Sequence, residues 1–131
     1  MGYGFPQHYR LNHPRQFQSV LRAPQHVVHR GTLRILANTN TMHGARLGLV
    51  VAKRDIRRAN ERNQVKRIVR EAFRHKRDEL PALDVIVLVR GANPGRRAAW
   101  GLAALVCEAF EELAIRSTGK AVASNKRNES V

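Results

Sequence analysis

Residues 46–74 read RLGLVVAKRDIRRANERNQVKRIVREAFR, and this stretch decides the fold. It opens with a short apolar run at residues 47–52, whose length and composition favour a buried central strand. A longer segment, about residues 59–80, repeats apolar side chains at helical spacing and stops before Pro81. The repeating residues are Val65, Ile68, Val69, Ala72 and Phe73. A buried strand followed by an amphipathic helix indicates a protein in which helices cover a sheet.

The flanking segments extend this pattern in both directions. A short amphipathic helix is expected from Pro14, with Phe17, Val20 and Leu21 on its apolar side. Residues 27–37 predict one or two strands broken near Gly31, and residues 85–89 (VIVLV) predict another buried strand. A last helix is marked by Ala99, Leu102, Val106, Ala109, Phe110 and Leu113. The order helix, strands, helix, strand, helix predicts an α+β fold, a single-domain α/β sandwich with about three helices on a four-stranded sheet.

The two ends of the chain differ in composition from this domain. Residues 1–12 are rich in Gly, Tyr, Pro and His and predict an irregular arm, and residues 13–116 form the domain. Residues 117–131 are polar and aperiodic, so we expect a disordered tail. No apolar run approaches the roughly 20 residues of a membrane span, and the lone Cys107 forms neither an intramolecular disulfide nor a cysteine-based zinc site. We therefore expect a cytoplasmic protein with no membrane segment.

Charge narrows the function. The chain has 24 Lys and Arg against 10 Asp and Glu, a net charge of +14 and a pI of about 11.6, which is typical of proteins that bind polyanions. Residues 53–77 alone hold eleven basic and three acidic side chains. Arg62, Lys66, Arg70 and Arg74 step by four, so they form a row beside the apolar stripe of the predicted helix. Like charges at this spacing destabilise a helix by a few tenths of a kcal/mol each. An ordinary solvent-exposed helix face would carry both acidic and basic residues. A row of basic residues alone therefore indicates that this face binds a phosphate backbone.

The same stretch resembles the signature region of the bacterial ribonuclease P protein subunit. The family pattern is a strand that begins with Arg-Leu/Ile-Gly and ends in Lys-Lys/Arg, here residues 46–54. An Ala follows, here Ala59, and then a helix that carries Arg-Asn, Lys-Arg, Arg-Glu/Gln and Phe, here Arg62-Asn63, Lys66-Arg67, Arg70-Glu71 and Phe73. The likeness extends over roughly residues 10–113, from Arg10-Leu11 and Phe17 through Leu80-Pro81 and Asp84. Gln64 departs from the pattern, because the family more often has Arg or Lys there. Leu21 and Ile35 stand where some members carry aromatic residues.

The resemblance implies both a sheet topology and a function. The sheet would be mixed, as in a domain fold shared with ribosomal proteins, with a left-handed crossover between parallel strands. The protein would bind one catalytic RNA as a monomer, together with precursor tRNA. Residues assigned to the catalytic RNA are Arg57, Arg58, Arg62, Asn63, Lys66, Arg67, Arg70 and Arg74. Residues assigned to the single-stranded 5′ leader of the precursor are Phe17, Lys53 and Arg54.

Two of these roles have structural alternatives. Asn63 could brace the start of its helix, and Phe17 could pack in the core beside Val20 and Leu21. No protein catalytic residue and no protein-bound metal or cofactor are expected, because the sequence lacks a nucleophile motif and a carboxylate cluster able to hold Mg²⁺. The resemblance assigns hydrolysis, with its Mg²⁺, to the RNA subunit. The rival functions are a ribosomal or ribosome-assembly protein with the same fold type and a protein-only nuclease.

Overall fold

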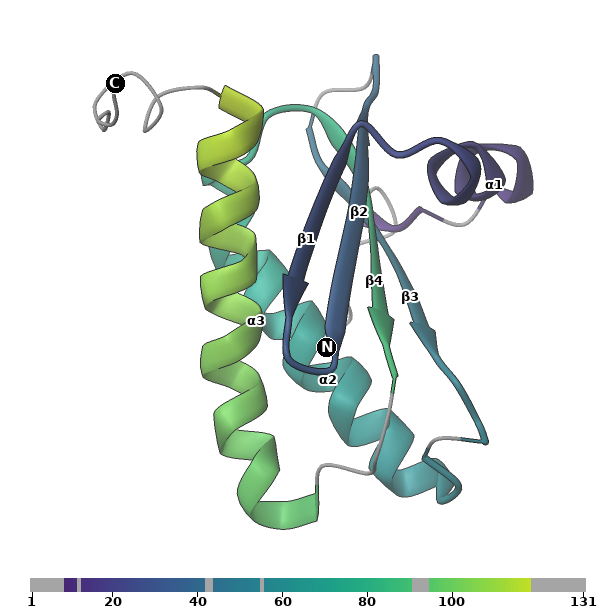
Figure 1. The fold of residues 1–131 in the computed structure, drawn as a ribbon, viewed down its shortest axis with the longest axis vertical. Helices are drawn as coiled ribbons and strands as arrows, with labels where there is room; N and C mark the ends of the chain where they lie inside the picture. The colour runs from purple at the N-terminus through teal and green to yellow at the C-terminus, as the bar shows by residue number, and fades with distance from the viewer. Residues whose placement is uncertain (1–8, 12, 42–43, 55, 91–94, 119–131) are drawn as a thin grey trace, which may run out of the picture.

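The computed structural model describes residues 9–11, 13–41, 44–54, 56–90 and 95–118. Its helices and strands follow the predicted order (Figure 1). They are α1 (Pro14–Arg22), β1 (His26–Arg30), β2 (Leu33–Thr39), β3 (Arg46–Val51), α2 (Ala59–Lys76), the 3-10 turn η2 (Arg77–Glu79), β4 (Leu83–Val89) and α3 (Gly95–Thr118). The predicted break in the first β segment is a turn between β1 and β2, where Gly31 has a φ of 56° that favours glycine. The α2 helix ends before Arg77, and η2 completes the approach to Pro81.

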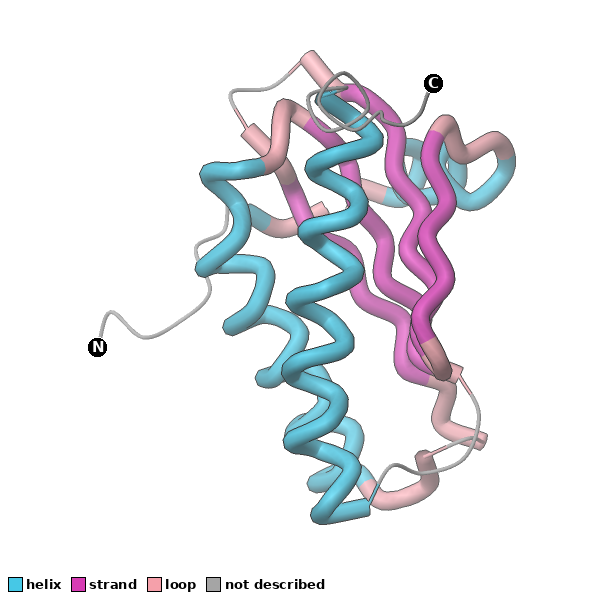
Figure 2. The backbone as a smooth tube through the Cα atoms, turned by 60° about the vertical axis from the view of Figure 1, so that its left-hand side comes forward, coloured by secondary structure: helices cyan, strands magenta, loops and turns pink. Residues whose placement is uncertain are grey.

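The four strands form one mixed sheet in the order β1-β2-β4-β3. The β1–β2 and β2–β4 pairs are antiparallel, whereas β3 and β4 are parallel and joined through α2. In Figure 1 both parallel strands run downward, β4 lies to the left of β3, and the sheet lies in front of α2. Figure 2 confirms that α2 and α3 share one side of the sheet. The β3–α2–β4 crossover is therefore left-handed, as the resemblance implied and against the strong general preference for right-handed crossovers.

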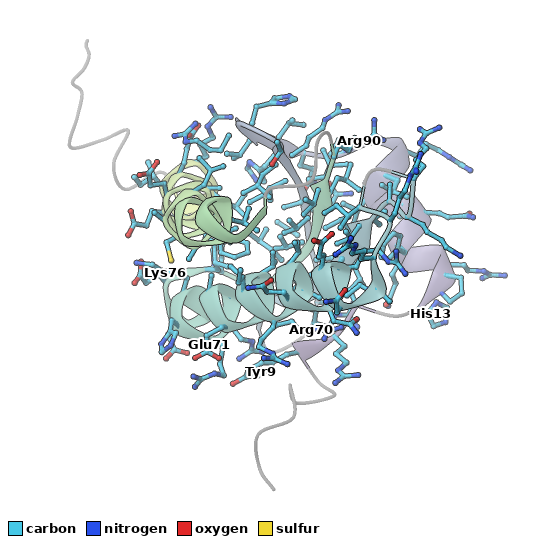
Figure 3. All side chains as sticks on the ribbon, turned by 90° about the horizontal axis from the view of Figure 1, so that it is seen from below. Tyr9, His13, Arg70, Glu71, Lys76 and Arg90 are labelled. Atoms are coloured by element: carbon cyan, nitrogen blue, oxygen red, sulfur yellow. The ribbon has the colours of Figure 1, made fainter. Side chains whose placement is uncertain are left out.

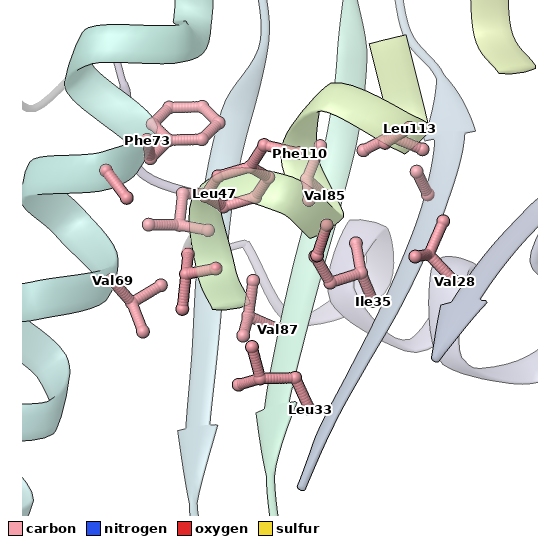
Figure 4. Close-up of a cluster of buried hydrophobic side chains, with 14 of the residues drawn as sticks. Val28, Leu33, Ile35, Leu47, Val69, Phe73, Val85, Val87, Phe110 and Leu113 are labelled. Atoms are coloured by element: carbon pink, nitrogen blue, oxygen red, sulfur yellow. The ribbon is translucent and has the colours of Figure 1, made fainter. Parts of the chain in front are cut away.

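The main core lies between the sheet and the helices α2 and α3 (Figure 4). Alternate residues of the central strands point into it, because neighbouring side chains on a strand face opposite sides. Phe73 of α2 and Phe110 of α3 are fully buried there, with ring centroids 5.7 Å apart in an edge-to-face arrangement. Ile35 of β2 is also fully buried in this core. The position of Ile35 therefore faces α2 and α3 and is not available to a nucleic-acid base.

A smaller core lies on the opposite side of the sheet, beneath α1. It contains Leu11, Val20, Leu36, Ile86 and Leu88, with Phe17 and Val27 packed at its edge. The Phe17 ring lies directly on Gly48 of β3, since a Cβ added at Gly48 would sit 2.6 Å from Phe17 Cε2. The absence of a side chain at residue 48 thus lets α1 approach the sheet closely.

Asp84 is the only buried charged residue in the described part of the chain. Its carboxylate accepts hydrogen bonds from Arg46 Nε and Nη2, at 2.9 and 3.0 Å, and from Asn40 Nδ2 at 2.9 Å. Arg46 and Asp84 are register partners across the parallel β3–β4 pair. This bidentate ion pair therefore fixes the register of the two strands that α2 connects.

Residues 9–11 of the predicted N-terminal arm pack against the domain. Arg10 forms a parallel bridge with Leu47, and the Leu11 N–H donates to the Leu47 carbonyl at 2.8 Å. Tyr9 packs on the main core, with its ring centroid 6.4 Å from that of Phe73, and Leu11 is buried in the smaller core. This short segment therefore covers the outer edge of β3. The predicted arm at residues 1–8 and the predicted tail beyond residue 118 lie outside the described residues.

Candidate nucleic-acid interface

The helix α2 has one buried face and one basic face. Val65, Val69, Ala72 and Phe73 point into the main core. Because successive residues turn by about 100°, the row at 62, 66, 70 and 74 lies along one flank of this buried stripe. Figure 3 shows Arg70 on this side of the molecule, in the same region as Tyr9. The predicted row is thus directed away from the core while the helix remains anchored to the sheet.

Arg62 makes intramolecular contacts. Its Nη1 donates to the carbonyl oxygens of Ile56 and Arg57, both at 2.8 Å. Ile56 is buried, and its N–H donates to the Ala52 carbonyl, so this bend leads from β3 into α2. The Arg62 side chain therefore stabilises the loop between β3 and α2. The spacing of basic residues along the sequence did not predict these two hydrogen bonds.

The C-terminal part of the row is partly neutralised. Glu71 accepts from Arg74 Nη2 at 2.5 Å and contacts His75 Nε2 at 2.9 Å. Hydrogen bonding to Arg74 is the main cause that lowers the pKa of Glu71, and the same bond raises the pKa of Arg74. Lys76 is similarly paired with Glu111 of α3 at 2.6 Å, which raises the pKa of Lys76. These cations therefore contribute less free positive charge than their number suggests.

The remaining cations of the predicted site make no ion pair within the residues that the structure describes. They are Arg57, Arg58, Lys66, Arg67 and Arg70. Arg57, Arg58 and Arg67 are exposed, whereas Lys66 and Arg70 are half-buried. Asn63 is exposed between them, and the N-cap position of α2 belongs to Arg58. The unpaired charge is thus concentrated at the start and middle of α2.

The residues predicted to hold a leader are brought to the other face and to one end of the sheet. Phe17 is half-buried on Gly48, which matches its packing alternative while leaving part of the residue exposed. Lys53 and Arg54 are exposed in a turn after β3, which ends at Val51. Neither residue therefore lies on a strand, so strand alternation does not direct either side chain to a face of the sheet.

Sequence reasoning missed a cation, Arg34, on the face of the sheet that carries α1. Arg34 alternates with Leu36, which packs beneath α1, so Arg34 points to that face. It is exposed, and its cross-strand neighbour His29 is exposed as well. Val50, on the same face of β3, is 36% exposed. The even parity of Arg34 within a strand was readable from the sequence, but the part of the sheet that α1 leaves uncovered was not.

Two features are absent from the described residues. Within 9–118, apart from the gaps given above, no three His, Cys, Asp or Glu side chains gather as a metal site would require. Among the helices described, none has the length and apolar character needed to cross a bilayer.

Comparison with known proteins identifies the relatives of this chain. The family model described as Ribonuclease P matches residues 5–100. The ribonuclease P protein component of an Escherichia coli O157:H7 strain is 42% identical over 113 residues, which cover 83% of this chain and 87% of that protein. The solved ribonuclease P protein of Staphylococcus aureus has a TM-score of 0.63 and 26% identity, covering 80% of this chain and 91% of that one. The ribonuclease P protein of Thermotoga maritima gives a TM-score of 0.62 and 27% identity, covering 82% and 96%.

A mixed α/β sandwich with unpaired cations along its crossover helix defines a small RNA-binding protein. Its relatives in sequence and in structure agree on a single family. The chain belongs to the bacterial ribonuclease P protein family. It is thus a component of an endoribonuclease complex that processes tRNA, and it has an RNA partner.

Proposed function

We propose that this chain binds the catalytic RNA of ribonuclease P through the outer face of α2 and holds the 5′ leader of precursor tRNA on the α1 side of the sheet. The observation that carries the proposal is the set of cations on α2 without ion pairs among the described residues, on a helix whose opposite face is buried. Such cations gain free energy when a phosphate backbone releases its counterions. The protein binds as a monomer, one per RNA, in the cytoplasm.

Within this proposal, the chain lowers the repulsion between two RNA molecules. The RNA subunit hydrolyses the phosphodiester bond and holds the Mg²⁺ that the reaction uses, while the protein holds no cofactor. Arg57, Arg58, Lys66, Arg67 and Arg70 bind phosphates of the RNA subunit, with Asn63 as a neutral hydrogen-bonding partner. Arg62 contributes mainly by fixing the start of α2, and Arg74 contributes a charge that Glu71 partly cancels.

The leader lies against the α1 side of the sheet. Lys53 and Arg54 in the turn after β3 and Arg34 on β2 supply positive charge, while Val50 and the exposed part of Phe17 supply apolar surface. A base stacked on an aromatic ring contributes about 1–3 kcal/mol, and it does so with little sequence preference. These are the properties expected of a site for single-stranded leaders of varied sequence. Mature tRNA lacks the leader, so it forfeits these contacts and is released.

The test is reconstitution with the ribonuclease P RNA of Escherichia coli and a leader-bearing tRNA at low Mg²⁺. The proposal expects the chain to stimulate cleavage and to bind precursor tRNA more tightly than mature tRNA in the presence of the RNA subunit. Lys66→Gln combined with Arg67→Gln should reduce the slope of log affinity against log salt by about two. Arg90→Gln, an exposed charge on the opposite side of the molecule, is the matched control. An equal affinity for precursor and mature tRNA would favour the ribosomal alternative, and cleavage by the chain alone would favour a protein-only nuclease.

A further inference from the structure

The segment of residues 9–11 places one more arginine beside α2. Its backbone pairs with the outer edge of β3 through the Arg10–Leu47 bridge and the hydrogen bond from Leu11 to Leu47. The residues on either side of Arg10 are anchored to different parts of the domain. Leu11 is buried in the smaller core, and the Tyr9 ring lies 3.9 Å below the guanidinium carbon of Arg77. Arg77 in turn donates through Nε to the Ala45 carbonyl at 2.8 Å. The backbone of Arg10 is therefore held firmly at this edge.

Arg10 and Arg70 come together although 60 positions separate them in the chain. Burial lowers the pKa of Arg70, and the positive charge of Arg10 lowers it further, so the two guanidinium groups lie within electrostatic reach. Arg10 is exposed and Arg70 is half-buried. Tyr9, the residue before Arg10, packs edge-on against Phe73 with ring centroids 6.4 Å apart, and Phe73 lies three residues along α2 from Arg70. Arg10 at the edge of β3 and Arg70 in the middle of α2 are thus near one another in the fold.

No acidic side chain in the described part of the chain relieves this repulsion. The nearest acid along α2, Glu71, is bound to Arg74 and His75. The charges of Arg10 and Arg70 remain uncompensated, since neither residue takes part in an ion pair or a side-chain hydrogen bond among the described residues. Two like charges held close together on rigid elements cost free energy in the unbound protein. That cost is recovered when an anion lies between them.

We propose that Arg10 and Arg70 together bind a single phosphate of the RNA backbone, so that the RNA surface extends from α2 across the edge of β3 onto the N-terminal segment. This inference rests on the proposed function, because it assumes that RNA lies along α2. Guanidinium groups suit a shared phosphate, since each donates two parallel hydrogen bonds to its oxygens. The backbone of Arg10 is held at a sheet edge and that of Arg70 in a helix packed on the same sheet, so both side chains extend from fixed points of the domain.

The experiment measures affinity for the ribonuclease P RNA of Escherichia coli across a series of salt concentrations, using the full chain. The variants are Arg10→Gln, Arg70→Gln and their combination. Lys66→Gln serves as the comparator on α2, and Arg90→Gln on the opposite side serves as the charge control. Each single variant of the pair should bind about tenfold more weakly and lose up to about one unit of salt slope. The double variant should be less than about threefold weaker than either single variant, because one phosphate is lost only once.

A melting curve of the unbound protein separates binding from packing. Arg70→Gln removes the repulsion from Arg10, so the melting temperature should stay the same or rise. A fall of more than about 5 °C would show that Arg70 serves the fold and would overturn the inference. The inference would also be overturned if the loss of RNA affinity in the double variant equalled the product of the two single losses, because that result indicates two separate phosphates. If Lys66→Gln weakens binding and Arg10→Gln does not, the shared site is refuted while the proposed function stands. If Lys66→Gln and both variants of the pair leave affinity and slope unchanged, the RNA surface on α2 itself is refuted.

Discussion

Replacing Arg62 by glutamine tests whether position in a basic row is enough to make a residue an RNA ligand. Arg62 Nη1 donates to the carbonyls of Ile56 and Arg57 at 2.8 Å, and these bonds hold the bend that leads into α2. A hydrogen bond from a charged group contributes about 1.5–3 kcal/mol when it is shielded from water. The Ile56 bond is partly buried and the Arg57 bond is exposed, so we count mainly the first. The expected loss is about 2 kcal/mol of unfolding free energy.

The measurement is thermal and urea unfolding followed by circular dichroism, with Arg67→Gln as the matched control on the same helix. For a domain of this size, about 2 kcal/mol lowers the melting temperature by about 5–10 °C. Arg67 is exposed and has no ion pair among the described residues, so its substitution should change stability by less than about 0.5 kcal/mol. In RNA binding we expect Arg67→Gln to have the larger effect of the two variants. It removes a cation without an ion pair, so it should reduce the slope of log affinity against log salt by about one.

Two results would refute this reasoning. An Arg62→Gln protein that melts like the parent would mean that the loop is held by other contacts. An Arg62→Gln protein that keeps its stability and loses a full unit of salt slope would restore Arg62 as a direct phosphate ligand.

Three further substitutions probe the ion pairs and the leader face. Asp84→Ala leaves the Arg46 side chain, which is only 12% exposed, without its partner, so the free energy of unfolding should fall by about 3–5 kcal/mol in a urea titration. An effect below about 1 kcal/mol would contradict a structural role for the pair. Phe17→Ala should weaken binding to precursor tRNA and leave binding to mature tRNA unchanged in a gel-shift comparison. A lower melting temperature together with an equal loss of affinity for both tRNAs would show that the Phe17 ring serves packing alone. Glu71→Gln releases Arg74, so RNA affinity and salt slope should rise. Because Arg74 lowers the pKa of Glu71, the small stabilisation from this exposed pair is present above a pH of about 4.5 and is lost as the pH falls, which a melting series across pH 2–7 would detect.

The helices and strands of this fold were predictable because each has its own pattern of apolar residues within a short segment of the sequence. Apolar runs at residues 47–52 and 85–89 became β3 and β4, and the helical repeat from Val65 to Phe73 became the buried face of α2. These patterns work locally, because an element must bury whichever side is apolar. The basic character of α2 followed from the same repeat, since whatever lies outside the apolar stripe faces solvent.

Local patterns could not show which charges are free. Arg62, Lys66, Arg70 and Arg74 are equivalent in spacing, yet Arg62 donates to a loop and Arg74 binds Glu71. The first contact depends on how the bend after β3 folds back on the helix. The second depends on which of several nearby cations the carboxylate selects. Neither is encoded by periodicity.

The sequence by itself determined a basic α/β protein with a cationic helix, because composition and the period of the apolar residues depend only on the order of side chains along the chain. Tertiary structure alone decided that Arg10 lies within reach of Arg70, that Phe17 rests on Gly48 and that Asp84 binds Arg46 across a parallel strand pair. These contacts join residues about 30 to 60 positions apart. Their partners were set by the strand order and by the left-handed crossover, which arise when the whole chain packs around one core.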